Sequence, residues 1–185
     1  MKEIRKKLAV VSSAVVMSAV AHSAMANDGK IDFVGGVTDT TCEVIVNGQS
    51  NNATVNLPVV SSKLLAAAGD VAGRTFLNFD LKNCALANGI TKARIFFAAG
   101  NTINPAGRLD NTEATGTKNV DLQILNTDMK VMNLSVGVDG QGATPVAIDA
   151  TAGTAKIRHY VQYFATGQST AGALKSSVEY ELAYE

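Results

Sequence analysis

The sequence predicts an all-β protein built as one antiparallel β-sandwich, and three observations lead to that prediction. Apolar and polar residues alternate with a period of two through most of the chain after residue 27, which is the pattern of half-buried strands. Turn sequences that contain glycine divide these runs. Only the short stretch 62–68 reads as a helix, behind a serine cap. The 185 residues, 46% of them hydrophobic, are enough for one domain with a sizeable core.

The first 26 residues read as a signal peptide and not as part of the fold. A positively charged start precedes an apolar stretch over residues 8–21, and the small residues Ala24 and Ala26 favour cleavage after Ala26. The apolar stretch is shorter than the roughly 20 residues that span a bilayer, which argues against a membrane anchor. We therefore expect an exported, soluble protein whose mature part begins at Asn27.

Charge limits the possible partners. The whole chain has 16 basic and 16 acidic residues, and removal of the signal peptide leaves 12 basic and 15 acidic ones. A mildly acidic chain lacks the basic field of a nucleic-acid binder. The charged fraction of 17% also argues against disorder. We expect no nucleic acid among the partners.

The expected strands follow one another with turns between them. Alternating apolar residues mark strands around 77–84, 120–124, 134–138, 157–163 and 178–184. The turns between runs are at Asn47-Gly48, Ala68-Gly69-Asp70, Asn88-Gly89, Asp139-Gly140 and Thr166-Gly167. Short strands with frequent turns and almost no helix favour an antiparallel sandwich.

The two cysteines, Cys42 and Cys84, both lie in the exported part of the chain. Two cysteines in an oxidising compartment usually pair, and a loop of this length would stabilise the fold by roughly 4 kcal/mol in the chain-entropy model. No C-x-x-C motif is present, and too few Cys and His residues remain for a zinc site. We predict a disulfide and no metal.

Both ends of the mature chain have unusual patterns. The last strand is one-sided, with Val178, Tyr180, Leu182 and Tyr184 on one face, and an apolar strand of this kind needs a neighbour. The segment before Cys42 alternates as well, at Ile31, Phe33, Gly35 and Val37. These patterns suggest strand exchange between molecules. From patterning alone, an arm that folds back into its own domain is equally compatible.

No catalytic constellation is recognisable in the sequence. His159 is the one histidine after the signal peptide, and no G-x-S-x-G motif accompanies it. We interpret it as a strand residue with a satisfied ring. The carboxylates Asp110, Glu113, Asp121 and Asp128 read as solvated side chains in turns or on outward strand faces. The sequence therefore predicts no enzyme, no cofactor and no small-molecule substrate.

Several segments together resemble the pilin subunits of chaperone–usher fimbriae, and most of all the major subunit of type 1 fimbriae. Residues 29–37 are similar to the family's N-terminal extension, and residues 119–125 and 163–167 are similar to two of its strands. The spacing of the cysteines matches the family's single disulfide. Gly172, 14th from the end, and the penultimate Tyr184 match its C-terminal pattern. Asp121 departs from the family, which often has a small residue there.

The resemblance implies an incomplete immunoglobulin-like β-sandwich that lacks its last strand. Residues 27–41 would be the donor-strand extension and residues 42–185 the pilin domain. Ile31, Phe33 and Val37 would enter a neighbour's groove, with Gly35 at a shallow point. The subunit's own groove would be lined by Gly172, Val178, Tyr180, Leu182 and Tyr184.

The implied function is that of a structural subunit of an extracellular adhesive fimbria. Its partners would be neighbouring subunits, a periplasmic chaperone and an outer-membrane usher, and its location the cell surface after passage through the periplasm. A minor or adaptor subunit is the alternative. A tip adhesin fits less well, because the 159 residues after cleavage leave no room for an additional lectin domain.

Overall fold

The computed structural model describes residues 30–185, so the expected signal peptide and residues 27–29 lie outside the described part. The chain divides into two units, one up to Gly36 and one from Val37 to Glu185. In the first unit, residues 30–36 form no regular secondary structure. The second unit holds all the described strands.

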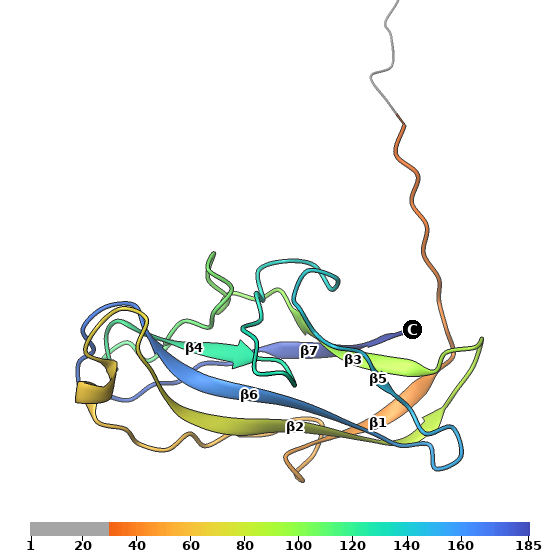
Figure 1. The fold of residues 1–185 in the computed structure, drawn as a ribbon, viewed down its shortest axis with the longest axis horizontal. Helices are drawn as coiled ribbons and strands as arrows, with labels where there is room; N and C mark the ends of the chain where they lie inside the picture. Colours follow the sequence, from red (N-terminus) through yellow and green to blue (C-terminus); the bar gives the residue numbers. More distant parts are fainter. Residues whose placement is uncertain (1–29) are drawn as a thin grey trace, which may run out of the picture. The chain divides into compact units, whose positions relative to one another are not determined.

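Two antiparallel sheets form the second unit (Figure 1). The first has the order β1 (Thr41–Val46), β2 (Val71–Ala85), β6 (Ala155–Ala165), β4 (Val120–Leu125). The second has the order β5 (Val146–Ala147), β3 (Lys92–Ala98), β7 (Glu179–Tyr184). The all-β sandwich predicted from the alternation is confirmed. No helix among residues 30–185 is long and apolar enough to cross a membrane.

The core lies between the two sheets and consists of the apolar members of the alternating runs. β2 and β3 contribute its largest side chains, including Phe79 and Phe97, whose rings meet edge to face at 6.3 Å between centroids. The disulfide Cys42–Cys84 joins β1 to β2, as predicted. The expected helix over 62–68 is a shorter 3₁₀ helix, η1 (Ser62–Leu65), and its cap is Ser61, whose hydroxyl accepts from the Lys63 N–H.

The expected strand over 134–138 is wrong. These residues form turns, although Leu134 is buried. The buried side chain of Gln141 bonds both backbone groups of Phe97, at 3.0 Å and 2.7 Å, and also contacts the carbonyls of Leu134 and Val136, each at 3.3 Å. One amide thus takes the place of a strand beside β3, because it supplies both a donor and an acceptor.

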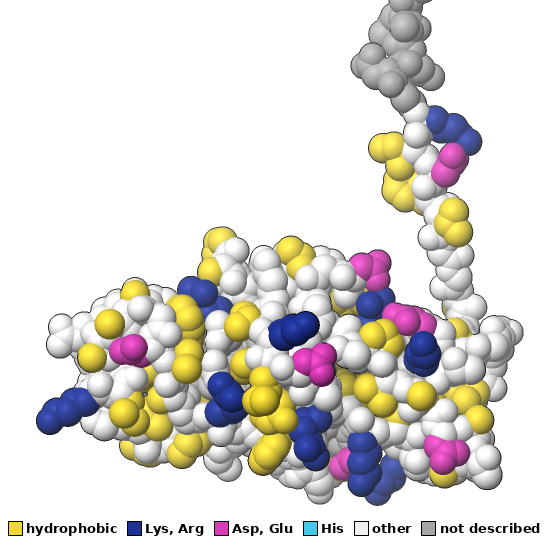
Figure 2. Space-filling model, in the orientation of Figure 1, with side chains coloured by type: hydrophobic (Ala, Val, Ile, Leu, Met, Phe, Trp, Pro, Cys, Tyr) yellow, Lys and Arg dark blue, Asp and Glu magenta, His cyan; other side chains and the backbone are white. Residues whose placement is uncertain are grey.

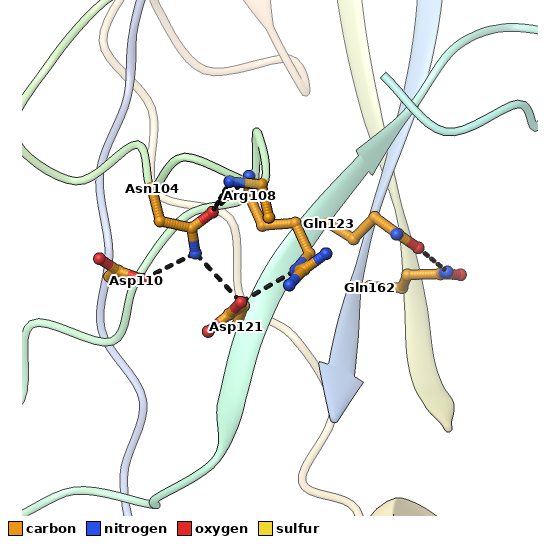
Figure 3. A network of polar contacts seen from close by, with 7 residues as sticks. Asn104, Arg108, Asp110, Asp121, Gln123 and Gln162 are labelled. Atoms are coloured by element: carbon orange, nitrogen blue, oxygen red, sulfur yellow. Dashed lines mark hydrogen bonds and ion pairs between the residues drawn. The ribbon is translucent and has the colours of Figure 1, made fainter. Parts of the chain in front are cut away.

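Asp121 is the second departure from expectation. It points outward from β4 but is only 9% exposed, because the loop over residues 102–110 covers it. The carboxylate accepts from Arg108 Nε at 2.9 Å and from Asn104 Nδ2 at 3.1 Å (Figure 3). The guanidinium of Arg108 also stacks on the ring of Phe164 at 4.2 Å. Asp121 therefore fastens the loop to the sheet.

We expect Asp121→Ala to destabilise the second unit by about 2 kcal/mol, because it leaves the half-buried Arg108 without its counterion. Asp128→Ala removes an exposed carboxylate beside the same strand and serves as the matched control, with an expected change of less than about 0.5 kcal/mol. Urea unfolding followed by circular dichroism measures both. Equal losses from the two variants would contradict the role assigned to Asp121.

Candidate functional site: a groove between two strand edges

An open groove of about 1210 Å³ runs beside β1 and β7, which belong to different sheets. Its floor is the core itself, with Phe79, Phe97 and Ile124 among the lining residues. One wall comes from residues 42–46 and 50–55, and the other from residues 176–182. A cleft larger than the usual 300–1,000 Å³ of a small-molecule pocket, and lined along two strands, suits an extended chain.

The groove exists because β1 pairs only with β2 and β7 pairs only with β3. Directly after β7, the N–H and C=O groups of Glu185 bond to those of Lys92, each at 2.9 Å. Antiparallel pairs alternate between bonded and non-bonded ones, and the register of β7 on β3 is regular. It follows that the backbone groups of Tyr180 and Leu182 face away from β3, toward the free edge.

The side chains of these same two residues line the groove. The Tyr180 ring contacts that of Phe79 at 5.0 Å, and its hydroxyl donates to the Asn51 carbonyl at 2.8 Å. Burial raises the pKa of Tyr180 above its usual value. Because each residue offers the groove both an apolar side chain and a free backbone edge, an entering strand would gain hydrogen bonds and burial at once.

Ser176 adds one unused polar group. Its buried hydroxyl oxygen has no hydrogen-bond partner among residues 30–185, and the residue lines the groove. A buried hydroxyl without a partner is costly, so this position favours an occupant that supplies a donor or an acceptor.

The structure brings together three of the five residues predicted for the groove. Val178, Tyr180 and Leu182 line it. Tyr184 is absent from the lining, and its half-buried ring packs on the core near the Cys42 backbone. Gly172 lies elsewhere, where an added Cβ would come within 2.5 Å of the Thr117 nitrogen. Its small size therefore serves the contact with residues 116–117.

Sequence reasoning missed the contribution of β1. Val44 and Val46 line the groove together with Cys42, and the three alternate on one strand face. That alternation is visible in the sequence, but its meaning depends on β7 being placed opposite by the fold. The segment 50–55 also lines the groove, but its apolar residues Ala53 and Val55 are too few to give a clear strand signal.

The residues predicted for the donor segment are highly exposed. Ile31 and Phe33 are 78% and 92% exposed, and Val37 is 98% exposed. Figure 2 shows uncovered apolar side chains, in yellow, along the described part of this segment. Val34, on the other phase of the alternation, is equally exposed at 99%. Large apolar side chains uncovered to this degree are unusual and are typical of surfaces that take part in association.

Comparisons with known proteins agree with this geometry. A family model described as type-1 fimbrial protein A matches residues 57–185. The chain belongs to the type-1 fimbrial protein family. It is 39% identical to the F17 fimbrial protein of Escherichia coli over 87% of this chain and 89% of that protein. It is 37% identical to the major fimbrial subunit SMF-1 of Stenotrophomonas maltophilia over 86% and 94% of the two chains.

Solved structures share the fold. The P pilus rod subunit PapA superposes with a TM-score of 0.57 at 17% identity, over 77% of this chain and 99% of its own. A subunit from a chaperone–usher pilus has the same TM-score at 19% identity, over 86% and 96%. The expected incomplete immunoglobulin-like pilin fold is therefore confirmed, and the chain is a structural pilin subunit by family.

His159 lies beneath the groove and is 1% exposed. Its ring meets those of Phe79 and Phe97 edge to face, at 6.0 Å and 5.6 Å. Nδ1 is 3.3 Å from the Leu125 carbonyl, whereas Nε2 has no partner among the described residues. His159 is a strand residue, as expected, but only one of its two ring nitrogens has a hydrogen-bond partner among the described residues. Burial lowers the pKa of His159 to about 4, against a smaller opposite effect of the Leu125 carbonyl.

This burial predicts an acid-sensitive core. The unfolded chain binds a proton at His159 below its ordinary pKa of 6.5, whereas the folded chain binds it only near pH 4. The contribution of neutral His159 to the free energy of unfolding is therefore fully present above pH 6.5. It is lost as the pH decreases toward 4, by on the order of 3 kcal/mol. We expect His159→Leu to flatten the stability curve over this interval. Urea unfolding at several pH values measures it, and an unchanged slope in the variant would refute the assignment.

Proposed function

We propose that this chain is a structural fimbrial subunit that polymerises by inserting the alternating part of its N-terminal segment 27–41, around residues 31–37, into the groove of the next copy. Thr41 itself begins β1 and stays in its own domain. The observation that carries the proposal is the pairing of an unfilled strand edge with an exposed, alternating segment in the same chain. Residues 42–185 then form the accepting domain. The chain supplies both halves of the joint, so identical copies can form an unlimited linear array.

The chemistry of the two halves is complementary. The groove offers an apolar floor and free backbone groups at Tyr180 and Leu182. The donor segment offers Ile31, Phe33 and Val37, which would share one face of an extended strand because even numbers of positions separate them. Burying three such side chains contributes on the order of 5–9 kcal/mol before the new backbone hydrogen bonds are counted. A joint of this size would dissociate very slowly.

An open core also explains the proposed partners before assembly. A groove whose floor is the hydrophobic core would associate with other strands during export. A periplasmic chaperone that lends a strand would cover it, and an outer-membrane usher would be the place where the next subunit's segment replaces that strand. The final location would be a fimbria on the cell surface.

We infer a structural and not a catalytic role for this subunit. The family consists of fimbrial proteins. The single histidine of residues 30–185 is buried among aromatic rings, and no cluster of metal-binding side chains is found in this part of the chain.

Two neighbouring residues of the donor segment distinguish specific insertion from non-specific apolar association. Phe33 and Val34 are neighbours with almost equal exposure, but only Phe33 lies on the proposed inserting face. We expect Phe33→Ala to reduce polymer yield strongly and Val34→Ala to leave it nearly unchanged. Detergent-resistant ladders on unheated gels measure the yield. Equal losses from both variants would contradict a donated strand and indicate simple apolar association.

A complementation experiment tests the joint itself. Deleting residues 27–37 removes the donor and leaves the groove, whereas Leu182→Glu blocks the groove and leaves the donor. We expect neither variant to polymerise alone, and a mixture of the two, released from the chaperone, to stop at a dimer. Lys63→Glu places the same charged side chain on an exposed residue of η1 outside the groove lining, so it is the control and retains polymerisation. Filaments from either variant alone would sink the proposal.

A further inference from the structure

The dipeptide Asn-Gly occurs twice in the sequence, and both copies occupy the same kind of turn. Asn47 and Gly48 have φ of 47° and 75°, and Asn88 and Gly89 have φ of 56° and 76°. A backbone hydrogen bond closes each turn, from Gln49 to Val46 at 2.9 Å and from Ile90 to Ala87 at 3.1 Å. Two consecutive residues with positive φ define the type I′ turn, for which Asn-Gly is the preferred sequence. The two sites are therefore matched in sequence and backbone.

They differ in how the asparagine side chain is held. Asn47 Nδ2 donates to the Phe76 carbonyl at 3.1 Å, and Asn47 Oδ1 accepts from the Asn78 N–H at 2.8 Å. Asn88 is exposed, and its carboxamide makes no hydrogen bond to any of residues 30–185. One carboxamide is fixed at both ends, whereas the other is free to rotate.

Asn-Gly is the sequence in which an asparagine side chain is chemically least stable. The glycine carries no side chain that would hinder approach of its backbone nitrogen to the carboxamide carbon. Attack by this nitrogen on the carboxamide carbon closes a five-membered ring, and the carboxamide must first turn toward the nitrogen. A side chain held by two hydrogen bonds must break both before it can turn, and a free side chain need break none.

We propose that Asn88 is a site of spontaneous deamidation and that Asn47 is protected from it. The Gly89 nitrogen attacks Cγ of Asn88, a C–N bond forms, and the Cγ–Nδ2 bond breaks. Ammonia leaves with the proton from the Gly89 nitrogen, and a five-membered succinimide remains. Water then opens either carbonyl of this ring to give aspartate or isoaspartate. No atom is oxidised or reduced, and water is the only co-reactant.

The site has structural neighbours that would respond to the change. The Ala87 N–H donates to the hydroxyl of Thr40 at 2.9 Å, just before β1 begins. On the other side of the turn, the Thr91 N–H donates to the Glu185 carbonyl at 2.8 Å, at the end of β7. Both products add a negative charge, and isoaspartate also lengthens the backbone by one methylene. The modified turn would therefore lie beside the start of β1 and the end of β7.

The test is a comparison of the two sites within one molecule. The purified protein without its signal peptide is incubated at mildly alkaline pH in water labelled with ¹⁸O, and the two turn peptides are quantified by mass spectrometry. We expect label to enter residue 88 faster than residue 47. The two hydrogen bonds of Asn47, at ordinary net strength, correspond to a rate difference of roughly 30-fold.

The same incubation in concentrated urea is the control for intrinsic reactivity. Unfolding releases the Asn47 carboxamide, so the two rates should approach each other. Asn88→Gln should abolish the fast phase and leave the slow one unchanged. The proposal is overturned if residue 47 reacts as fast as residue 88 in the folded protein. It is equally overturned if residue 88 reacts only in urea. Neither outcome depends on polymerisation, because both rates are read from single chains.

Discussion

The backbone hydrogen bonds that β1 and β7 leave unmade are the constraint on which the rest of the structure depends. Each of these strands has one partner, and the groove beside their edges reaches down to the core. In a closed sandwich those edges would be paired or covered. Here the residues that should complete the core, Tyr180 and Leu182, remain only half-buried. The groove therefore combines unpaired backbone N–H and C=O groups of two strands with an apolar core that is incompletely covered.

The other two sheet edges show that the opening is specific. At the β4 edge, Leu109 and Leu122 exchange two backbone hydrogen bonds of 2.8 Å, and a further bridge joins Leu125 to Val131. On the side of β3 away from β7, β5 is only two residues long, and Gln141 satisfies Phe97 beyond it. Short strands and covering loops are the usual protection of exposed edges. Within residues 30–185, the two edges that border the groove are the ones without such protection, which favours a role for them in association.

The sequence predicts four of the seven described strands because their signal is local, and it does not predict β1, β3 and β5. Alternation places β2, β4, β6 and β7, and the Asn-Gly turns follow from the residues that tolerate positive φ. Burial that depends on distant segments could not be predicted in this way. Asp121 is covered because the loop 102–110 returns over β4, and Leu134 is buried without a strand because Gln141 reaches β3. In both cases a side chain from elsewhere changes the environment that the local pattern suggests.

The groove was predictable in part for the same reason. The apolar face of β7 is evident in the sequence, whereas the opposite wall is formed by β1 and residues 50–55, which only the fold places there. Gly172, a small residue near the last strand, is not among the lining residues and has its close contacts with residues 116–117. A pattern on one strand indicates that a partner surface is needed. It does not say which segment supplies that surface.

The disulfide gives the open edge its rigidity. A strand with one neighbour and a free edge tends to fray, and β1 is such a strand. Cys42–Cys84 fixes its start to β2, and the turn at Asn47, whose side chain bonds Phe76 and Asn78 of β2, fixes its end. β1 is therefore held at both ends while its middle residue Val44 lines the groove. An edge held in this way loses little conformational entropy when a strand binds it, so more of the binding free energy is available to the joint.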